Sequence, residues 1–219
     1  MTKPNILPAE LAGLLWTWWR GDVLPSLPVL QDLRVCVVED SDFLSRLCRL
    51  DVPQIKERLR GAHQPYVAWI GAVPVAYGWS ASGPTHFGSP PVSFVVSSGN
   101  RYLTGFATLP AWRGRGIYPR LLQAILERER AHAERFWILH RRDNLASARG
   151  IRKAGFANVA EIHFLEGGGL GILPLEDGDR SLAGAQLLGL PLAMPSGRLG
   201  RNPLAPCIVG RQCAGHSPL

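Results

Sequence analysis

The residues from Arg101 to Phe156 decide the fold, and they run RYLTGFATLPAWRGRGIYPRLLQAILERERAHAERFWILHRRDNLASARGIRKAGF. Their pattern predicts a strand, a basic glycine-rich turn, an amphipathic helix, a second strand and a short helix. β-Branched and aromatic residues favour the first strand, which Pro110 ends because proline cannot donate to a sheet ladder. The spacing of the apolar residues in the helix predicts a face buried on a sheet, formed by Ile117, Leu121, Leu122, Ile125 and Leu126.

The turn Arg113-Gly114-Arg115-Gly116 lies directly before this helix. A helix N-terminus offers unpaired N–H groups and the positive end of the helix dipole, so it can bind an anion. Glycine lets the backbone approach a phosphate closely, and arginine adds charge-assisted hydrogen bonds. Pro119, in the first helical turn, lacks only an N–H that would have no helical partner. The turn therefore predicts a phosphate site, although a connecting turn with solvated arginines fits the same residues equally well.

The second half of the stretch adds a second motif. The residues from Phe136 to His140 predict another buried strand, and Asp143 or Asn144 can cap the short helix that follows. Glycine at position 155 is the residue expected just after a helix end. A resemblance to the acetyl-CoA-binding core of the GNAT family of N-acetyltransferases rests on Thr108-x-Pro110-x-x-Arg113-x-x-Gly116, followed by Asn144-x-x-Ser147 and Gly155-Phe156.

The resemblance implies an α/β fold, with a mixed, mostly antiparallel central sheet and helices on both faces. It also implies a splay between the strands that end at Pro110 and His140, where the pantetheine arm of acetyl-CoA would lie. Backbone groups would hold this arm and polarise the thioester carbonyl, and Asn144 would bind the arm, act as a helix cap, or do both. The implied cofactor-binding residues are Phe106, Ala107, Thr108, Arg113, Gly114, Arg115, Gly116, Ile117, Tyr118, Pro119, Asn144 and Ser147.

The activity implied by the resemblance is transfer of an acetyl group from acetyl-CoA to an amine by direct attack in a ternary complex, without a metal. The acceptor would be a small molecule or a peptide amine. His140 ends the second strand and is the candidate base, because an imidazole titrates in the useful pH range. The alternation of the strand leaves open that His140 instead faces the opposite layer.

Two positions depart from the family pattern. Tyr118 stands where the phosphate turn usually has a second glycine or alanine, and Ile151 stands where many members have a tyrosine that protonates the departing thiolate. Tyr118 and Tyr102 are the nearby phenols, and Tyr118 is the candidate acid; a packing role is the simpler interpretation of both. Because isoleucine cannot donate a proton, a CoA-binding protein without turnover, acting as a sensor or partner module, is the alternative function.

The sequence as a whole is predicted to divide into three parts. Residues 1–30 form an N-terminal extension around a helix over Ala9 to Arg20, residues 31–176 form the acetyltransferase domain, and residues 177–219 form a loosely ordered tail. Within the tail, Leu182 to Leu192 favours a helix. The expected further strands are Leu33 to Val38, a hairpin of Tyr66 to Ile70 with Val75 to Ser80, a hairpin of Val92 to Ser97 with Tyr102 to Leu109 after a loop at Ala81 to Pro91, and a hairpin of Val159 to Leu165 with Leu170 to Leu175.

Composition narrows the class of protein. A chain of 219 residues with a hydrophobic fraction of 46% can bury the core of one ordinary domain. Half of its 24 basic residues lie between Arg101 and Lys153, which suits a phosphate-bearing cofactor, and no zinc-finger or RNA-binding signature suggests nucleic acid. No apolar run is long enough to span a membrane. We therefore expect a cytoplasmic monomer or homodimer with reduced thiols at Cys36, Cys48, Cys207 and Cys213.

Overall fold

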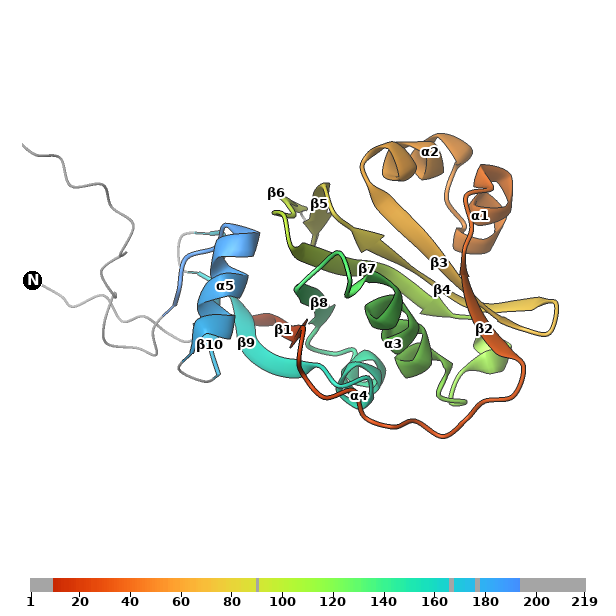
Figure 1. Cartoon of the computed structure of the whole chain (residues 1–219). Helices are drawn as coiled ribbons and strands as arrows, with labels where there is room; N and C mark the ends of the chain where they lie inside the picture. Colours follow the sequence, from red (N-terminus) through yellow and green to blue (C-terminus); the bar gives the residue numbers. More distant parts are fainter. Residues whose placement is uncertain (1–9, 90, 166–167, 176–177, 194–219) are drawn as a thin grey trace, which may run out of the picture.

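The computed structural model describes residues 10–89, 91–165, 168–175 and 178–193, and its main feature is a large sheet with helices on both faces (Figure 1). The sheet has the strand order β10-β9-β1-β8-β7-β4-β3-β2. Its neighbouring strands run antiparallel except β7 and β8, which are parallel. The predicted mixed, mostly antiparallel α/β fold is confirmed. The strands are β1 (Leu11–Trp19), β2 (Leu33–Val37), β3 (His63–Ile70), β4 (Val73–Ala81), β7 (Asn100–Thr108), β8 (Arg135–Arg141), β9 (Ala157–Phe164) and β10 (Leu170–Pro174).

The helices divide between the two faces of this sheet. On one face lie α3 (Ile117–Glu129) and α4 (Leu145–Lys153); on the other lie α1 (Ser41–Cys48), α2 (Val52–Arg60) and α5 (Asp179–Leu188) (Figure 1). The buried hydrophobic residues form separate clusters on the two faces, because successive side chains of a strand point to opposite faces of the sheet. Phe136 packs in the cluster of α3 and α4, whereas Trp137 packs in the cluster of α5.

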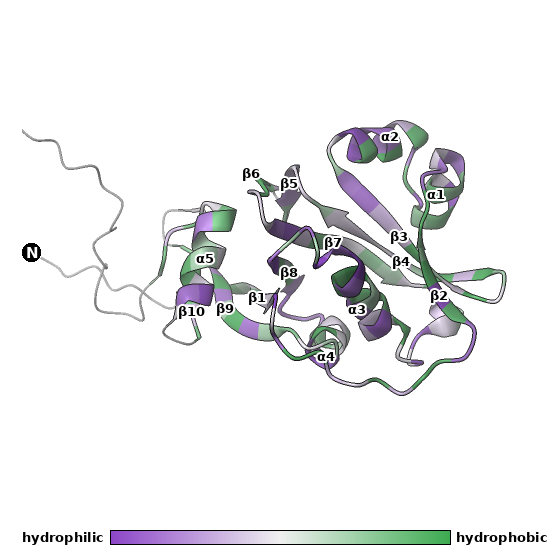
Figure 2. Ribbon diagram, in the orientation of Figure 1, coloured by the Kyte–Doolittle hydropathy of each residue, from purple (hydrophilic) through white to green (hydrophobic). Residues whose placement is uncertain are grey.

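The apolar stripe predicted for α3 is buried. Its five members are at most 1% exposed, and each buried aliphatic side chain of this size stabilises the fold by about 1.5–3 kcal/mol. Figure 2 shows both hydrophobic and hydrophilic residues along α3, as an amphipathic helix requires. The helix begins after Gly116, whose φ of 71° lies in the left-handed region that glycine adopts without strain.

The predicted N-terminal helix is wrong, because Leu11–Trp19 forms β1. This strand lies inside the sheet, hydrogen-bonded to β8 on one side and to β9 on the other. Trp16 and Trp18 pack on the α3 and α4 face, and Leu15 packs on the α5 face. A strand buried on both faces has a continuous apolar run with no polar alternation, and such a run cannot be distinguished from a buried helix by periodicity.

The hairpins were predicted in part. The β3–β4 and β9–β10 hairpins are confirmed, but the expected loop at Ala81 to Pro91 contains a strand. This strand, β5 (Pro84–Phe87), pairs with β6 (Val92–Val95) in a separate small sheet, so β6 does not pair with β7 as expected. Instead β7 lies between β4 and β8.

The C-terminal prediction falls partly outside the described residues. Helix α5 overlaps the helix expected over Leu182 to Leu192 but begins and ends earlier, at Asp179 and Leu188. The rest of the expected tail, residues 194–219, lies outside the described part of the chain, as do Cys207 and Cys213. Cys36 and Cys48 are free thiols.

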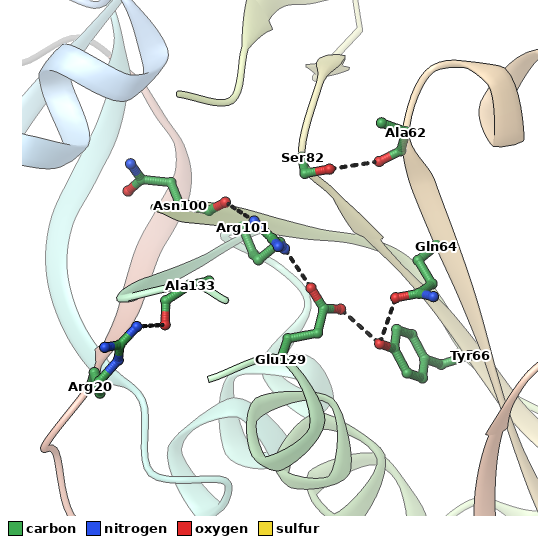
Figure 3. Close-up of polar contacts among 9 residues, drawn as sticks. All are labelled: Arg20, Ala62, Gln64, Tyr66, Ser82, Asn100, Arg101, Glu129 and Ala133. Carbon is green, nitrogen blue, oxygen red and sulfur yellow. Dashed lines mark hydrogen bonds and ion pairs between the residues drawn. The ribbon is translucent and has the colours of Figure 1, made fainter. Parts of the chain in front are cut away.

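A buried polar network joins the C-terminal end of α3 to the sheet (Figure 3). The carboxylate of Glu129 accepts a hydrogen bond from the hydroxyl of Tyr66 at 2.8 Å and pairs with the guanidinium of Arg101 on β7. The same hydroxyl also bonds Gln64. Burial, together with the neighbouring charge of Glu129, raises the pKa of the Tyr66 phenol above its usual value. The network therefore ties α3 to β3 and β7.

Candidate active site

The parallel strands β7 and β8 pair over only part of their length. Asn100 to Leu103 pair with Arg135 to Ile138, and the ladder stops there although both strands continue. From the next residues onward, Thr104 on β7 and Leu139 on β8, the two strands diverge. The backbone of β7 beyond Leu103 therefore has no strand partner on the β8 side, and the splay expected from the sequence is present between these two strands.

A β-bulge changes the direction of β7 at the point where β7 and β8 diverge. Gly105 has a φ of +63°, and the pairing with β4 shifts register opposite it. Phe106 then lies against Gly78, where a Cβ atom would come within 2.1 Å of the ring. Only glycine at position 78 lets the Phe106 ring approach the sheet this closely.

The basic turn leaves the N-terminus of α3 open. Gly114 has a φ of +77°, and a Cβ atom built on it would meet nothing within 4 Å. No side chain caps α3, and within the described residues the N–H groups of Gly114, Arg115 and Gly116 donate no hydrogen bond. These amides are therefore available to an anion at the positive end of the helix dipole.

The arginines of the turn are held beside these amides. The Arg113 Nε donates to the carbonyl of Thr108 at 3.1 Å, and the Arg115 guanidinium lies 4.8 Å from the centre of the Trp112 ring. Both arginines are exposed. Arg120 donates to the carbonyl oxygens of Gly116 and Pro28, so it binds the acceptor groups of the turn and leaves the N–H donors free.

Several predicted residues meet where β7, α3 and α4 adjoin. The Tyr118 ring lies 5.5 Å from the Phe106 ring, and its hydroxyl lies 3.3 Å from the Ser147 Oγ. A Cβ atom on Gly150 would come within 2.4 Å of this ring. The tyrosine ring can therefore pack against α4 only because position 150 has no side chain. Burial raises the pKa of the Tyr118 phenol above its usual value, which the hydrogen bond with Ser147 only partly offsets. The phenol is therefore protonated at neutral pH.

Asn144 has the capping role that the sequence left open. Its Oδ1 accepts a hydrogen bond from the N–H of Ser147 at 3.0 Å, and the residue is exposed just after the end of β8. Ile117 and Pro119 are buried in the first turn of α3, so Ile117 can offer a ligand only its backbone. Ile151 is also fully buried, among the apolar residues of the core on the α3 and α4 face.

His140 lies at the end of β8 with one ring nitrogen uncommitted. The Nδ1 lies 2.7 Å from the carbonyl oxygen of Arg141, and because a carbonyl only accepts, Nδ1 carries the proton. This leaves Nε2 with a lone pair, and Nε2 is buried without a hydrogen-bond partner in the described chain. The ring packs 6.0 Å from that of Trp16, on the face of α3 and α4. A lone pair without a partner is what a proton acceptor needs.

A cavity of about 860 Å³ opens where β7 and β8 part. Thr104 and Leu139, the first residues beyond the paired ladder, both line it, and so does His140. Its far walls come from the start of β1, from β9 and β10, and from the hairpin of β5 and β6. Sequence reasoning missed these walls, because they come from distant segments that carry no motif.

Other kinds of site are not found in the described residues. No group of three or more histidine, cysteine, aspartate or glutamate residues there could hold a metal ion. Over the same residues, no helix combines the length and the apolar composition needed to cross a membrane.

Comparisons with known proteins point to one family. The sequence model of the acetyltransferase (GNAT) family matches residues 33–156, more than half of the chain. No curated protein matches. Among solved structures, similar chains include an acetyltransferase of the GNAT family from Colwellia psychrerythraea (14% identity, TM-score 0.49) and an acetyltransferase of the GNAT family from Novosphingobium aromaticivorans (16% identity, TM-score 0.48). The matches cover 70% and 72% of this chain but only 55% and 65% of those chains.

Proposed function

The chain belongs to the GNAT acetyltransferase family, and from this premise we propose that it is an N-acetyltransferase that moves an acetyl group from acetyl-CoA to an amine in a ternary complex. One observation carries the proposal. The open amides at the start of α3 lie at the end of β7, whose splay from β8 opens into a cavity. A donor held at the turn and an acceptor held in the cavity would meet at this splay.

The residues at the turn fit acetyl-CoA as the donor substrate. The free N–H groups of Gly114, Arg115 and Gly116 would bind its pyrophosphate, and the exposed guanidinium groups of Arg113 and Arg115 would add positive charge. The backbone of Phe106, Ala107 and Thr108, which has no strand partner on the β8 side, would bind the pantetheine arm. Asn144 and Ser147 adjoin the splay from α4 and would contact the same arm.

The transfer requires one bond to form and one to break. The amine nitrogen attacks the thioester carbonyl carbon, the C–S bond breaks, and the CoA thiolate leaves. The nitrogen then loses a proton, for which the lone pair of the His140 Nε2 is the proposed acceptor. The thiolate gains a proton. Tyr118 is protonated and would donate a hydrogen bond to the thiolate, while the proton itself comes from solvent or from His140.

One observation favours the alternative of a CoA-binding protein without turnover. Ile151 is buried in the apolar core, and an isoleucine side chain cannot donate a proton. Consumption of the thioester separates the two functions, because a sensor binds acetyl-CoA but does not convert it in the presence of any amine.

Binding of acetyl-CoA tests the proposal, and the turn offers a matched pair of variants. Gly114 and Gly99 have the same φ of +77°, and a Cβ atom on either meets nothing within 4 Å. Gly114→Ala and Gly99→Ala therefore cost similar backbone strain, but only the first adds a methyl group where the pyrophosphate would lie. Calorimetric titration should show affinity at least about tenfold weaker for Gly114→Ala and unchanged for Gly99→Ala. Equal affinities for the two variants would refute this placement of the pyrophosphate.

A further inference from the structure

The charges at the cavity are confined to its rim and are paired there. Arg141 and Asp143 form an ion pair at 2.9 Å, and Arg142 and Glu10 form another at 3.4 Å. All four side chains are more than half exposed. The other residues that line the cavity include no carboxylate, so within the described residues no unpaired negative charge there is left to pair with an ammonium group.

The walls of the cavity are largely apolar, and their neutral polar side chains include Tyr102 and Thr104. Phe87, Leu139 and Ile162 are among its walls. Tyr102 and Thr104 both carry hydroxyl groups. The Tyr102 ring is fixed edge-on against Phe94 at 5.1 Å. These groups can donate to an uncharged ligand but cannot neutralise a cation.

We propose that the acyl acceptor is a primary amine carried on a bulky apolar or aromatic body that has no second cationic group. The inference rests on the proposed function and adds the acceptor class to it. A volume of about 860 Å³ lies in the range of sites for organic ligands, which is about 300–1,000 Å³. An apolar site disfavours the ammonium form and lowers the pKa of the bound amine, so the acceptor binds as the neutral nucleophile. A polyamine would have to desolvate a further charge without a partner.

The test is a comparison of amines with acetyl-CoA as donor. The full chain should acetylate 2-phenylethylamine with a kcat/KM at least about 100-fold above that for putrescine, since burying the ring removes a large apolar area from water. A peptide amide that begins with phenylalanine is assayed in parallel. The comparison shows whether the aromatic amine is recognised as a free amine or as a peptide N-terminus. A preference for putrescine would overturn the proposal.

Two substitutions on one strand locate the site. Val92 of β6 lines the cavity, whereas Val95 of the same strand does not line it and is 65% exposed. Val92→Trp should fill the cavity and raise the KM for 2-phenylethylamine at least about tenfold, with the Kd for acetyl-CoA unchanged, and Val95→Trp should change neither. An unchanged KM in folded Val92→Trp would show that the acceptor does not bind in this cavity. Failure of the wild type to bind acetyl-CoA would instead refute the proposed function itself.

Discussion

The ring of His140 is fixed so that only one nitrogen can exchange a proton. Because Nδ1–H is committed to the carbonyl of Arg141, only Nε2 could take the proton of the amine in the proposed reaction. His140→Gln keeps a polar side chain of similar size but removes the basic lone pair. We expect kcat to fall by about 100-fold with little change in the Kd for acetyl-CoA.

The control for this variant is His132→Gln, at an exposed histidine just after α3. It should leave kcat unchanged. A His140→Gln protein with wild-type kcat would exclude His140 as the base, and a loss of acetyl-CoA binding would assign it a structural role.

Tyr118 is larger than the glycine or alanine usual at this position, yet it does not block the turn before α3. Its ring packs onto Phe106 and Gly150, and the space above Gly114 stays open. The larger residue is accommodated because α4 has a glycine where the ring lies. This pairing of Tyr118 with Gly150 could not be predicted from the sequence, since the two residues lie on different helices.

At the scale of elements, β1 is the largest difference between expectation and structure. It lies outside the residues that the family model matches, yet it pairs with β8 and β9 near the middle of the sheet. Motifs such as Gly116 and Asn144 act within a few residues and could be predicted. The place of a strand in a sheet depends on partners more than 100 residues away, as Thr17 shows by donating to the carbonyl of Phe136.

Replacement of one β1 side chain tests the role of this strand. Trp18 is 2% exposed, and Trp18→Ala should lower the free energy of unfolding by about 3–5 kcal/mol. Val29→Ala, at a residue that is 92% exposed, should change it by less than about 0.5 kcal/mol. Urea denaturation measures both. A loss below about 1 kcal/mol for Trp18→Ala would mean that residues 11–19 are an appendage rather than part of the core.

At the scale of the whole molecule, an ion pair joins the turn after β1 to α5. The carboxylate of Asp22 accepts two hydrogen bonds from Arg180, at 2.6 and 2.8 Å, and another from the N–H of Trp19. The hydrogen bonds from Arg180 hold the pKa of Asp22 below its usual 3.8, although burial opposes them. A lowered pKa in the folded state stabilises the protein above pH 3.8, and this contribution is lost as pH falls through the folded value.

The pH dependence of an Asp22→Asn variant tests this link. The variant should be less stable than the wild type at about pH 6, and the difference should shrink towards about pH 3 as Asp22 becomes protonated in the wild type. Thermal unfolding at a series of pH values measures the difference. A difference that stays constant with pH would show that the charge of Asp22 does not contribute.

The cavity is also a property of the whole molecule. Its walls combine the start of β1, the ends of β8 and β9, and the hairpin of β5 and β6, which meet only after the sheet has formed. The proposed donor side lies in the continuous stretch that the sequence singled out, whereas the proposed acceptor side is assembled from separated segments that carry no motif. The acceptor class therefore had to be inferred from the structure.

The most direct test of donor binding at the turn is to follow the backbone amides of Gly114 and Gly116 by nitrogen–proton NMR while CoA is added. Binding of the pyrophosphate at the start of α3 should shift both resonances in a saturable way and leave that of Gly99 in place. Saturable CoA binding that shifts other amides but neither of these two, or no binding at all, would contradict it.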